Sequence, residues 1–230
     1  MLTHRPSDAR GKTKLDWLDS KHSFSFAEYR DPNHVQFRTL RVINEDVIAP
    51  GAGFGMHGHQ DMEIITYMLD GTIEHKDTLG SVGQITPGEI QRMTAGTGVY
   101  HSEYNASEVG PAHLLQIWIF PRQNGLKPSW EQKAITFKPG QLNLIASPDG
   151  GEGVVTIHQD AWISAARLKK GEEVTQTLSR APYVWVQVAK GTLTVNGKAL
   201  SAGDALGLTD EKELTLTAAS DAEVLVFELM

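Results

Sequence analysis

Short runs of alternating hydrophobic and polar residues recur along the chain, and turns rich in glycine and proline separate them. Alternation with a period of two is typical of a strand that buries one face, and a short apolar run between turns is typical of a fully buried strand. Evenly spaced short strands indicate a sandwich or a barrel. The pattern predicts an all-β fold, with strands at 37–43, 63–69, 72–76, 84–86 and 114–120, and again at 184–188, 191–195 and 224–229.

Turn-forming residues follow several of these runs. Residues 44–46 (Asn-Glu-Asp) predict a turn after the first run, and Asp70-Gly71 is a dipeptide typical of a two-residue hairpin. Prolines and glycines become frequent between residues 121 and 150, which predicts a junction between two domains. We expect an N-terminal domain over 1–130, a linker region over 131–150 and a C-terminal domain over 151–230.

The two halves of the chain share a frame of glycines. Gly51 and Gly71 recur 120 residues later as Gly171 and Gly191, and the turn at 87–89 recurs 115 residues later at 202–204. A repeated frame indicates repeated architecture. The second copy lacks the polar residues of the first: His57, His59 and Glu63 become Thr177, Ser179 and Tyr183, and His101 and Glu103 fall on Leu216 and Ala218. We therefore expect a second domain with the same scaffold and no metal ligands.

Composition narrows the chemistry and the cellular setting. The 230 residues include no cysteine, which excludes disulfide scaffolds, cysteine nucleophiles, zinc fingers and iron–sulfur clusters. A metal site must therefore use the nine histidines and the 28 acidic residues. The net charge of −7, with no basic cluster longer than Lys169-Lys170, argues against direct binding of nucleic acid. No apolar run approaches the ~18 residues of a membrane span and no apolar leader is present, so we expect a cytoplasmic protein.

Two pairs of potential metal ligands stand out. His57-Gly-His59 places two imidazoles on one face of a strand, because side chains two residues apart point the same way. His101-Ser-Glu103 repeats this spacing after a glycine-rich turn. A single pair of this kind is weak evidence, but two pairs within one β segment are stronger. Together they offer three imidazoles and one carboxylate, a set that suits iron, manganese, copper, nickel or zinc and leaves positions open for catalysis.

The spacing around these pairs resembles two known motifs. Gly51-x5-His57-x-His59-x3-Glu63 resembles the first cupin motif, and Gly98-x2-His101-x3-Asn105 resembles the end of the second. The longer string over residues 53–105, which includes Gly71-x3-His75-x-Asp77 and Met93-Thr-Ala-Gly-Thr-Gly98, is similar to the pirin family. That resemblance implies a bicupin, with two β-barrel or jelly-roll cupin domains in one chain.

The resemblance also implies a site and a function. It implies that His57, His59, His101 and Glu103 hold one metal ion per chain, with iron(II) expected and zinc, manganese, copper, nickel or cobalt as alternatives. Some bacterial pirins are quercetin 2,3-dioxygenases, so the expected function is a metal-dependent dioxygenase of flavonols. Its partners would be a flavonol-like small molecule and dioxygen. Glu103 would be the catalytic residue, because it could ligate the metal and accept the proton of the substrate hydroxyl.

Other readings stay open beside this one. Pirins also include transcription cofactors, so the alternative is a redox-sensitive iron-binding regulatory protein that acts through a protein partner. A sugar isomerase or a germin-like metal enzyme is a weaker option. We expect a monomer. Glu63 is a candidate neighbour of the metal ligands, His75 is equally a neighbour or a packing residue, and Phe26 either packs at an edge or faces substrate.

Overall fold

The structure, a computed structural model, describes residues 1–230 and consists almost wholly of β-strands, which confirms the all-β prediction. Its one helix is a short 3-10 turn, η1 (Ser7–Ala9), and no helix is long and apolar enough to cross a membrane. The chain divides into two compact units. We call Gly11–Ile135 with Asp149–Gln159 the N-terminal unit, and Met1–Arg10 with Thr136–Pro148 and Asp160–Met230 the C-terminal unit.

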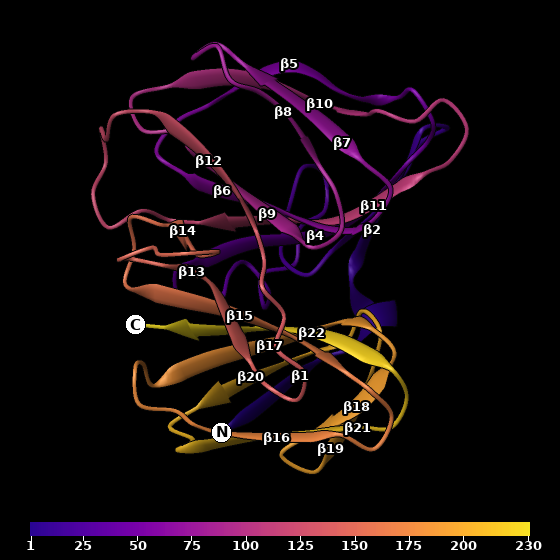
Figure 1. Cartoon of the computed structure of the whole chain (residues 1–230), viewed down its shortest axis with the longest axis vertical. Coiled ribbons are helices and arrows are strands. Elements are labelled where there is room, and N and C mark those ends of the chain that lie inside the picture. The colour runs from indigo at the N-terminus through magenta and orange to yellow at the C-terminus, as the bar shows by residue number, and fades with distance from the viewer. The chain divides into compact units, whose positions relative to one another are not determined.

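The N-terminal unit is built from two antiparallel sheets that face each other (Figure 1). The smaller sheet has the order β5 (Gly53–His59), β10 (Val99–Asn105), β7 (Ile73–Asp77) and β8 (Val82–Ile85). The larger sheet has the order β12 (Ser129–Ala134), β9 (Glu89–Thr94), β6 (Glu63–Asp70), β11 (Ala112–Ile119), β4 (Leu40–Ile48), β3 (Leu18–His22) and β2 (Gly11–Lys14). The short strand β14 (Val155–Thr156) also belongs to this unit.

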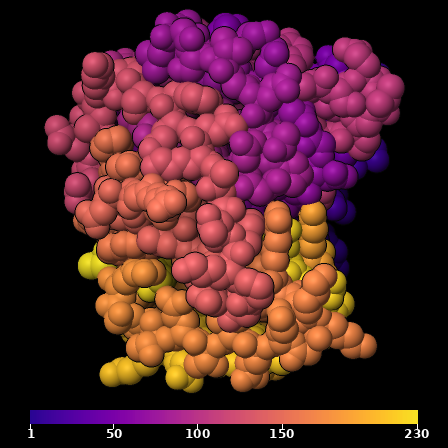
Figure 2. All heavy atoms as spheres, viewed as in Figure 1, coloured from indigo at the N-terminus to yellow at the C-terminus, as the bar shows by residue number.

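Apolar side chains from both sheets meet inside the N-terminal unit. Ile48 and Met68 of the larger sheet pack with Ile73 and Ile85 of the smaller one, and all four are fully buried. Burial of this kind is the main stabilising contribution to a sandwich, at roughly 25 cal/mol per Å² of apolar surface. On the face shown in Figure 2, salmon-coloured atoms from near residue 130 lie beside purple atoms of earlier residues, which agrees with the pairing of β12 with β9.

The C-terminal unit repeats this arrangement. Its smaller sheet has the order β16 (Glu173–Thr177), β21 (Glu213–Ala218), β18 (Thr192–Val195) and β19 (Lys198–Ser201). Its larger sheet contains β1 (Leu2–Arg5), β20 (Ala205–Thr209), β17 (Tyr183–Lys190), β22 (Ala222–Leu229), β15 (Ala161–Leu168) and β13 (Asn143–Ser147), paired in that order. The strands β6 and β17 match at an offset of 120 residues, as the glycine frame predicts. The expected repeat is therefore present in the structure.

The interior of the C-terminal unit is apolar where the first unit is polar. The strand register places Leu216, not Ala218, at the position of Glu103 and Leu214 at that of His101, and both belong to a cluster of buried aliphatic side chains. The candidate clusters of three metal-ligating residues all lie in the N-terminal unit. The second scaffold accordingly offers no imidazole or carboxylate at these positions.

Gly71 explains why the glycine frame is shared, and it corrects one prediction. Asp70-Gly71 does not form a hairpin, because β6 pairs with β9 and β11 whereas β7 pairs with β8 and β10 in the other sheet. Gly71 has φ +71°, and a Cβ there would lie 2.6 Å from the carbonyl oxygen of Pro111. Gly191 repeats both features beside Asp221, with φ +75° and a Cβ distance of 2.1 Å. Glycine is thus needed at this particular crossing between sheets in both units.

Three further expectations differ from the structure. The predicted turn at 44–46 is wrong, because β4 continues to Ile48 and buries Asn44 and Asp46 on the same face as Val42. Within residues 131–150, expected to be a linker, the structure has the end of β12 and all of β13. Residues 1–10, expected in the first domain, lie in the C-terminal unit because β1 pairs with β20. The prolines and glycines of 121–150 mark loops between strands in a chain that passes between the units more than once.

Candidate metal centre

Three histidines from two neighbouring strands converge inside the N-terminal unit. β5 and β10 pair antiparallel with His57 opposite His101, and His59 is two residues along β5 from His57. The ring centroids are 4.5 Å apart for His57 and His101, 4.7 Å for His57 and His59, and 4.9 Å for His59 and His101. One nitrogen from each ring lies within 4.8 Å of the other two. This spacing allows three imidazoles to bind one ion.

The environment of these rings favours the neutral form that a metal requires. Burial lowers the pKa of His101 to about 3, and the neighbouring His57 and His75 lower it further. Burial likewise lowers the pKa of His59 to about 4, with His101 and His57 contributing. Neutral imidazole has a lone pair to donate, whereas imidazolium has none.

A hydrogen bond determines which ring nitrogen of His57 is free to accept, and one ring nitrogen of His101 has no hydrogen-bond partner. Nδ1 of His57 donates to the carbonyl oxygen of Gly55 at 2.8 Å, which leaves its Nε2 as the acceptor. Nε2 of His101 is buried and has no hydrogen-bond partner. A buried polar nitrogen without a partner is costly, and a bound cation would satisfy it. The residues therefore fit a divalent metal ion.

Glu103 lies beside His101 and is held firmly. Its side chain is 3% exposed, and its carboxylate groups with His101 and His75 at metal-ligand spacing. Oε1 accepts hydrogen bonds from Thr66 Oγ1 at 2.9 Å and from Gln91 Nε2 at 3.4 Å, and Oε2 accepts one from Gln116 Nε2 at 2.6 Å. These three donors fix the carboxylate at the edge of the histidine cluster. The structure thus brings together His57, His59 and His101, with Glu103 adjacent to the last of them.

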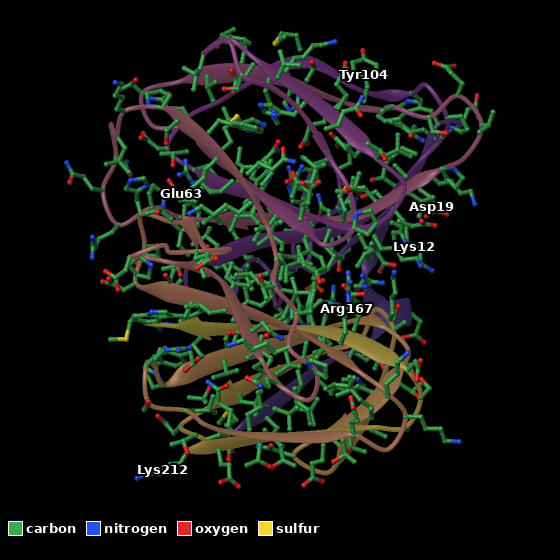
Figure 3. The ribbon with its side chains drawn as sticks, viewed as in Figure 1. Lys12, Asp19, Glu63, Tyr104, Arg167 and Lys212 are labelled. Carbon is green, nitrogen blue, oxygen red and sulfur yellow. The ribbon has the colours of Figure 1, made fainter.

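Glu63, a candidate neighbour of the metal ligands, is not among the residues that cluster at metal-ligand spacing. The chain turns after His59, and Glu63 begins β6 in the larger sheet, so the two residues do not share a strand. Glu63 is fully buried, and its Oε2 accepts hydrogen bonds from Thr94 Oγ1 at 3.1 Å and from the backbone N–H of His158 at 3.3 Å. Burial raises its pKa. Glu63 and Tyr104, both labelled in Figure 3, lie on different sheets of the unit.

The histidine cluster opens on a cavity of about 340 Å³ within the N-terminal unit. One part of its wall is apolar and includes Trp17, Phe26, Phe54, Ile64 and Trp118. Trp118 packs edge-on against His59, with ring centroids 4.9 Å apart. The volume lies in the range of pockets that enclose small organic molecules.

The remaining wall carries a polar array that the sequence analysis missed. Ser20, His22, Asn44 and Asp46 line the cavity from β3 and β4. Ser20 donates a hydrogen bond to Asp46, and His22 Nδ1 lies 2.8 Å from Asn44 Oδ1. Burial raises the pKa of Asp46 to about 7; the charges of Glu103 and Glu45 add to this rise, and the Ser20 hydrogen bond opposes it. Asn44 and Asp46 have the same parity as Leu40 and Val42, so a strand continued through residues 44–46 could have signalled this array.

Comparisons with known proteins agree with this site and fold. A family model described as Pirin matches residues 3–119, and a model described as Quercetinase C-terminal cupin domain matches residues 144–229. A protein of Escherichia coli strain K12 named quercetin 2,3-dioxygenase is 46% identical over 229 residues, which cover 100% of this chain and 99% of that protein. A pirin-like protein of Caulobacter vibrioides is 41% identical over 99% of each chain.

Solved structures show the same architecture. The crystal structure of YhhW from Escherichia coli matches with a TM-score of 0.96 at 46% identity, covering 100% of this chain and 98% of that one. A structure of bacterial pirin YhhW in complex with nickel(II) matches with a TM-score of 0.94 at 46% identity and covers 99% of that chain. The predicted bicupin fold, with two cupin domains in one chain, is confirmed.

Proposed function

Since the chain belongs to the pirin family, we propose that its N-terminal unit is a metal-dependent dioxygenase of flavonols, with His57, His59, His101 and Glu103 as ligands of one divalent ion. The observation that carries this proposal is the cluster of three ring nitrogens within 4.8 Å of one another, one of them buried without a partner, at the wall of a 340 Å³ cavity. The names of the Escherichia coli relative and the nickel complex of YhhW support it.

Iron(II) is the metal we propose, although nickel occupies the solved relative. When bound, a divalent ion supplies a Lewis acid that lowers the pKa of a coordinated hydroxyl and keeps open positions for substrate and dioxygen. Four nitrogen and oxygen ligands suit several first-row metals, so availability and geometry decide which one is bound. The metal content of protein purified without added metal is the direct measurement.

The residues around the cluster would bind and orient the substrate. Phe26, Phe54 and Trp118 offer flat apolar surfaces for an aromatic ring system and exclude water from it. Glu103 is the proposed acceptor of the proton that the flavonol 3-hydroxyl loses, since Thr66, Gln91 and Gln116 hold its carboxylate at the edge of the cluster. Asp46 and Ser20 offer hydrogen-bonding partners for ring hydroxyl groups on the opposite wall.

The test loads purified protein separately with iron(II), nickel(II) and manganese(II) and follows loss of quercetin absorbance together with oxygen consumption. We expect turnover with at least one metal and none with Glu103→Gln. An established flavonol dioxygenase in the same buffer is the positive control. Full metal occupancy with no loss of quercetin would contradict the proposal. The alternative of an iron-dependent regulatory protein stays a prediction.

A further inference from the structure

The loop that joins β3 to β4 forms a second hollow in the N-terminal unit, of about 610 Å³ and open to solvent. It shares Phe26, Ala27 and Trp118 with the cavity at the histidine cluster, so the two spaces lie on either side of these residues. Ala27 has φ +47°, an uncommon conformation for a residue with a Cβ. Backbone strain of this kind collects at binding sites more than elsewhere.

Two arginines in this hollow have no carboxylate partner. Arg41 Nη1 donates to the backbone carbonyls of Ser25 at 2.7 Å and Val35 at 3.0 Å, and Arg30 Nη1 donates to those of Ala27 and Tyr29. Burial lowers the pKa of Arg41, and the nearby positive charge of Arg30 lowers it further. Arg30 and Arg41 line the same hollow, and two guanidinium groups there, in a chain of net charge −7, form a local site for an anion.

One acidic residue, Asp31, lines the same hollow and limits the negative charge that a bound ligand can carry. The carboxylate of Asp31 accepts hydrogen bonds from His34 Nδ1 at 2.7 Å, from Tyr29 OH at 3.1 Å and from the backbone N–H of Asn33 at 3.0 Å. Three of its hydrogen-bonding positions are therefore occupied by other residues of the loop. Two guanidinium groups and one carboxylate leave a single net positive charge when His34 is neutral. That balance suits a monoanion better than a dianion.

The walls between these charges are largely apolar. Phe26, Pro32, Val35 and Trp118 line the hollow together with the aliphatic part of Arg41. Phe26 and Trp118 meet edge to face, with centroids 5.5 Å apart, so they present two differently oriented ring surfaces. Such walls gain little from an inorganic ion and more from an organic one that carries a ring.

We infer that this hollow binds an aromatic monocarboxylic acid, with its carboxylate between Arg30 and Arg41 and its ring against Phe26 and Trp118. A planar guanidinium can donate two parallel hydrogen bonds to a carboxylate, which a neutral amide of the same shape cannot accept in the same way. The site uses none of the proposed metal ligands. Its occupation therefore does not require the metal, although it shares Phe26 and Trp118 with the cavity proposed to bind the flavonol.

The test is calorimetric titration of the metal-free full chain with sodium benzoate, repeated with benzamide and with inorganic phosphate at one ionic strength. We expect saturable binding of benzoate in the millimolar range or tighter, weakening as salt is added, and at least tenfold weaker binding of the other two probes. Quenching of tryptophan fluorescence by benzoate should follow the same curve, because Trp118 lines the hollow. Benzamide or phosphate binding as tightly as benzoate would overturn the inference.

Variants locate the bound acid. Arg30→Gln and Arg41→Gln should each weaken benzoate binding about tenfold or more. Arg41→Lys retains the charge and a donor to the loop carbonyls but loses the fork, so it should weaken binding less than Arg41→Gln with the loop still folded. The matched control is Arg122→Gln, which removes one exposed positive charge outside the hollow and should bind as the wild type does. Benzoate binding unchanged in both Gln variants, or absent from the wild type, refutes the site.

Discussion

Nδ1 of His101 lies 3.5 Å from Nδ1 of His75, and this contact determines which nitrogen of His101 is free. Nε2 of His75 lies 3.1 Å from the Asp77 carboxylate and donates a hydrogen bond to it. Neutral His75 then has only Nδ1 as an acceptor, so His101 donates from its own Nδ1. Nε2 of His101 is left as a lone pair directed away from this chain of bonds. His75, which the sequence left as either a neighbour of the metal ligands or a packing residue, therefore orients a proposed ligand.

Replacing His75 should weaken metal binding without disturbing the fold. His75 stacks on Trp130 at 5.8 Å, so His75→Phe keeps an aromatic ring in the same place and removes only the hydrogen bonds. Loss of an orienting partner of this kind typically lowers metal affinity by about 10- to 100-fold. A competition titration with a chelator of known affinity measures the change. His113→Phe, at a histidine that contacts Glu45 instead, is the control and should keep wild-type affinity.

His57→Ala should abolish metal binding and leave the chain folded. His57 is half-buried on β5, and removing a partly exposed side chain from a strand costs about 1 kcal/mol or less. Elemental analysis should find one ion per chain in the wild type and almost none in the variant, with similar melting temperatures for the metal-free forms. Retention of one ion per chain in His57→Ala would refute the ligand assignment, and two ions in the wild type would contradict the apolar interior of the second unit.

Asp46 should make the metal-free protein less stable as the pH rises. Its pKa is raised from 3.8 to about 7, so the folded state holds a proton that the unfolded state releases. The penalty is absent below about pH 4, grows between pH 4 and 7, and reaches on the order of 4 kcal/mol above pH 7. Asp46→Asn removes the ionisation, so its stability advantage over the wild type should increase by a few kcal/mol between pH 5 and pH 8. Urea unfolding at both pH values checks this, and an advantage that does not vary with pH would argue against a raised pKa.

Gly71→Ala should be more damaging than Gly80→Ala. Both glycines have positive φ, +71° and +89°, so both substitutions introduce backbone strain of about 1 kcal/mol. Only at Gly71 does the added methyl group also meet backbone atoms, whereas a Cβ at Gly80 meets nothing within 4 Å. We expect Gly71→Ala to lower the free energy of unfolding by at least 1–2 kcal/mol more than Gly80→Ala does. Equal losses would show that the close approach to Pro111 is not maintained in solution.

Much of this architecture follows from side-chain periodicity, and the rest depends on contacts that periodicity does not report. His57 and His59 could be placed on one face because a strand alternates with period two. Asn44 and Asp46 follow the same rule. Without knowledge of the cavity that they line, however, two polar residues so close together indicate a turn. Asp70-Gly71 likewise carries the local signal of a hairpin, and only the pairing of distant strands shows that it joins two sheets. Glu63 was misplaced because a turn separates it from the strand of His59.

The pairing of β1 with β20 has a consequence for how the chain is made. Met1 and Thr209 are joined by a hydrogen bond although they are 208 residues apart in sequence, and β1 belongs to the C-terminal unit. During synthesis β1 leaves the ribosome long before its partner strand exists. Every residue of the N-terminal unit is available once Gln159 has emerged, so that unit can fold first while β1 waits unpaired. The C-terminal unit, which lacks the metal ligands, therefore completes its fold later. It does so through the pairing of β1 with β20, a contact of high sequence separation that is slow to form.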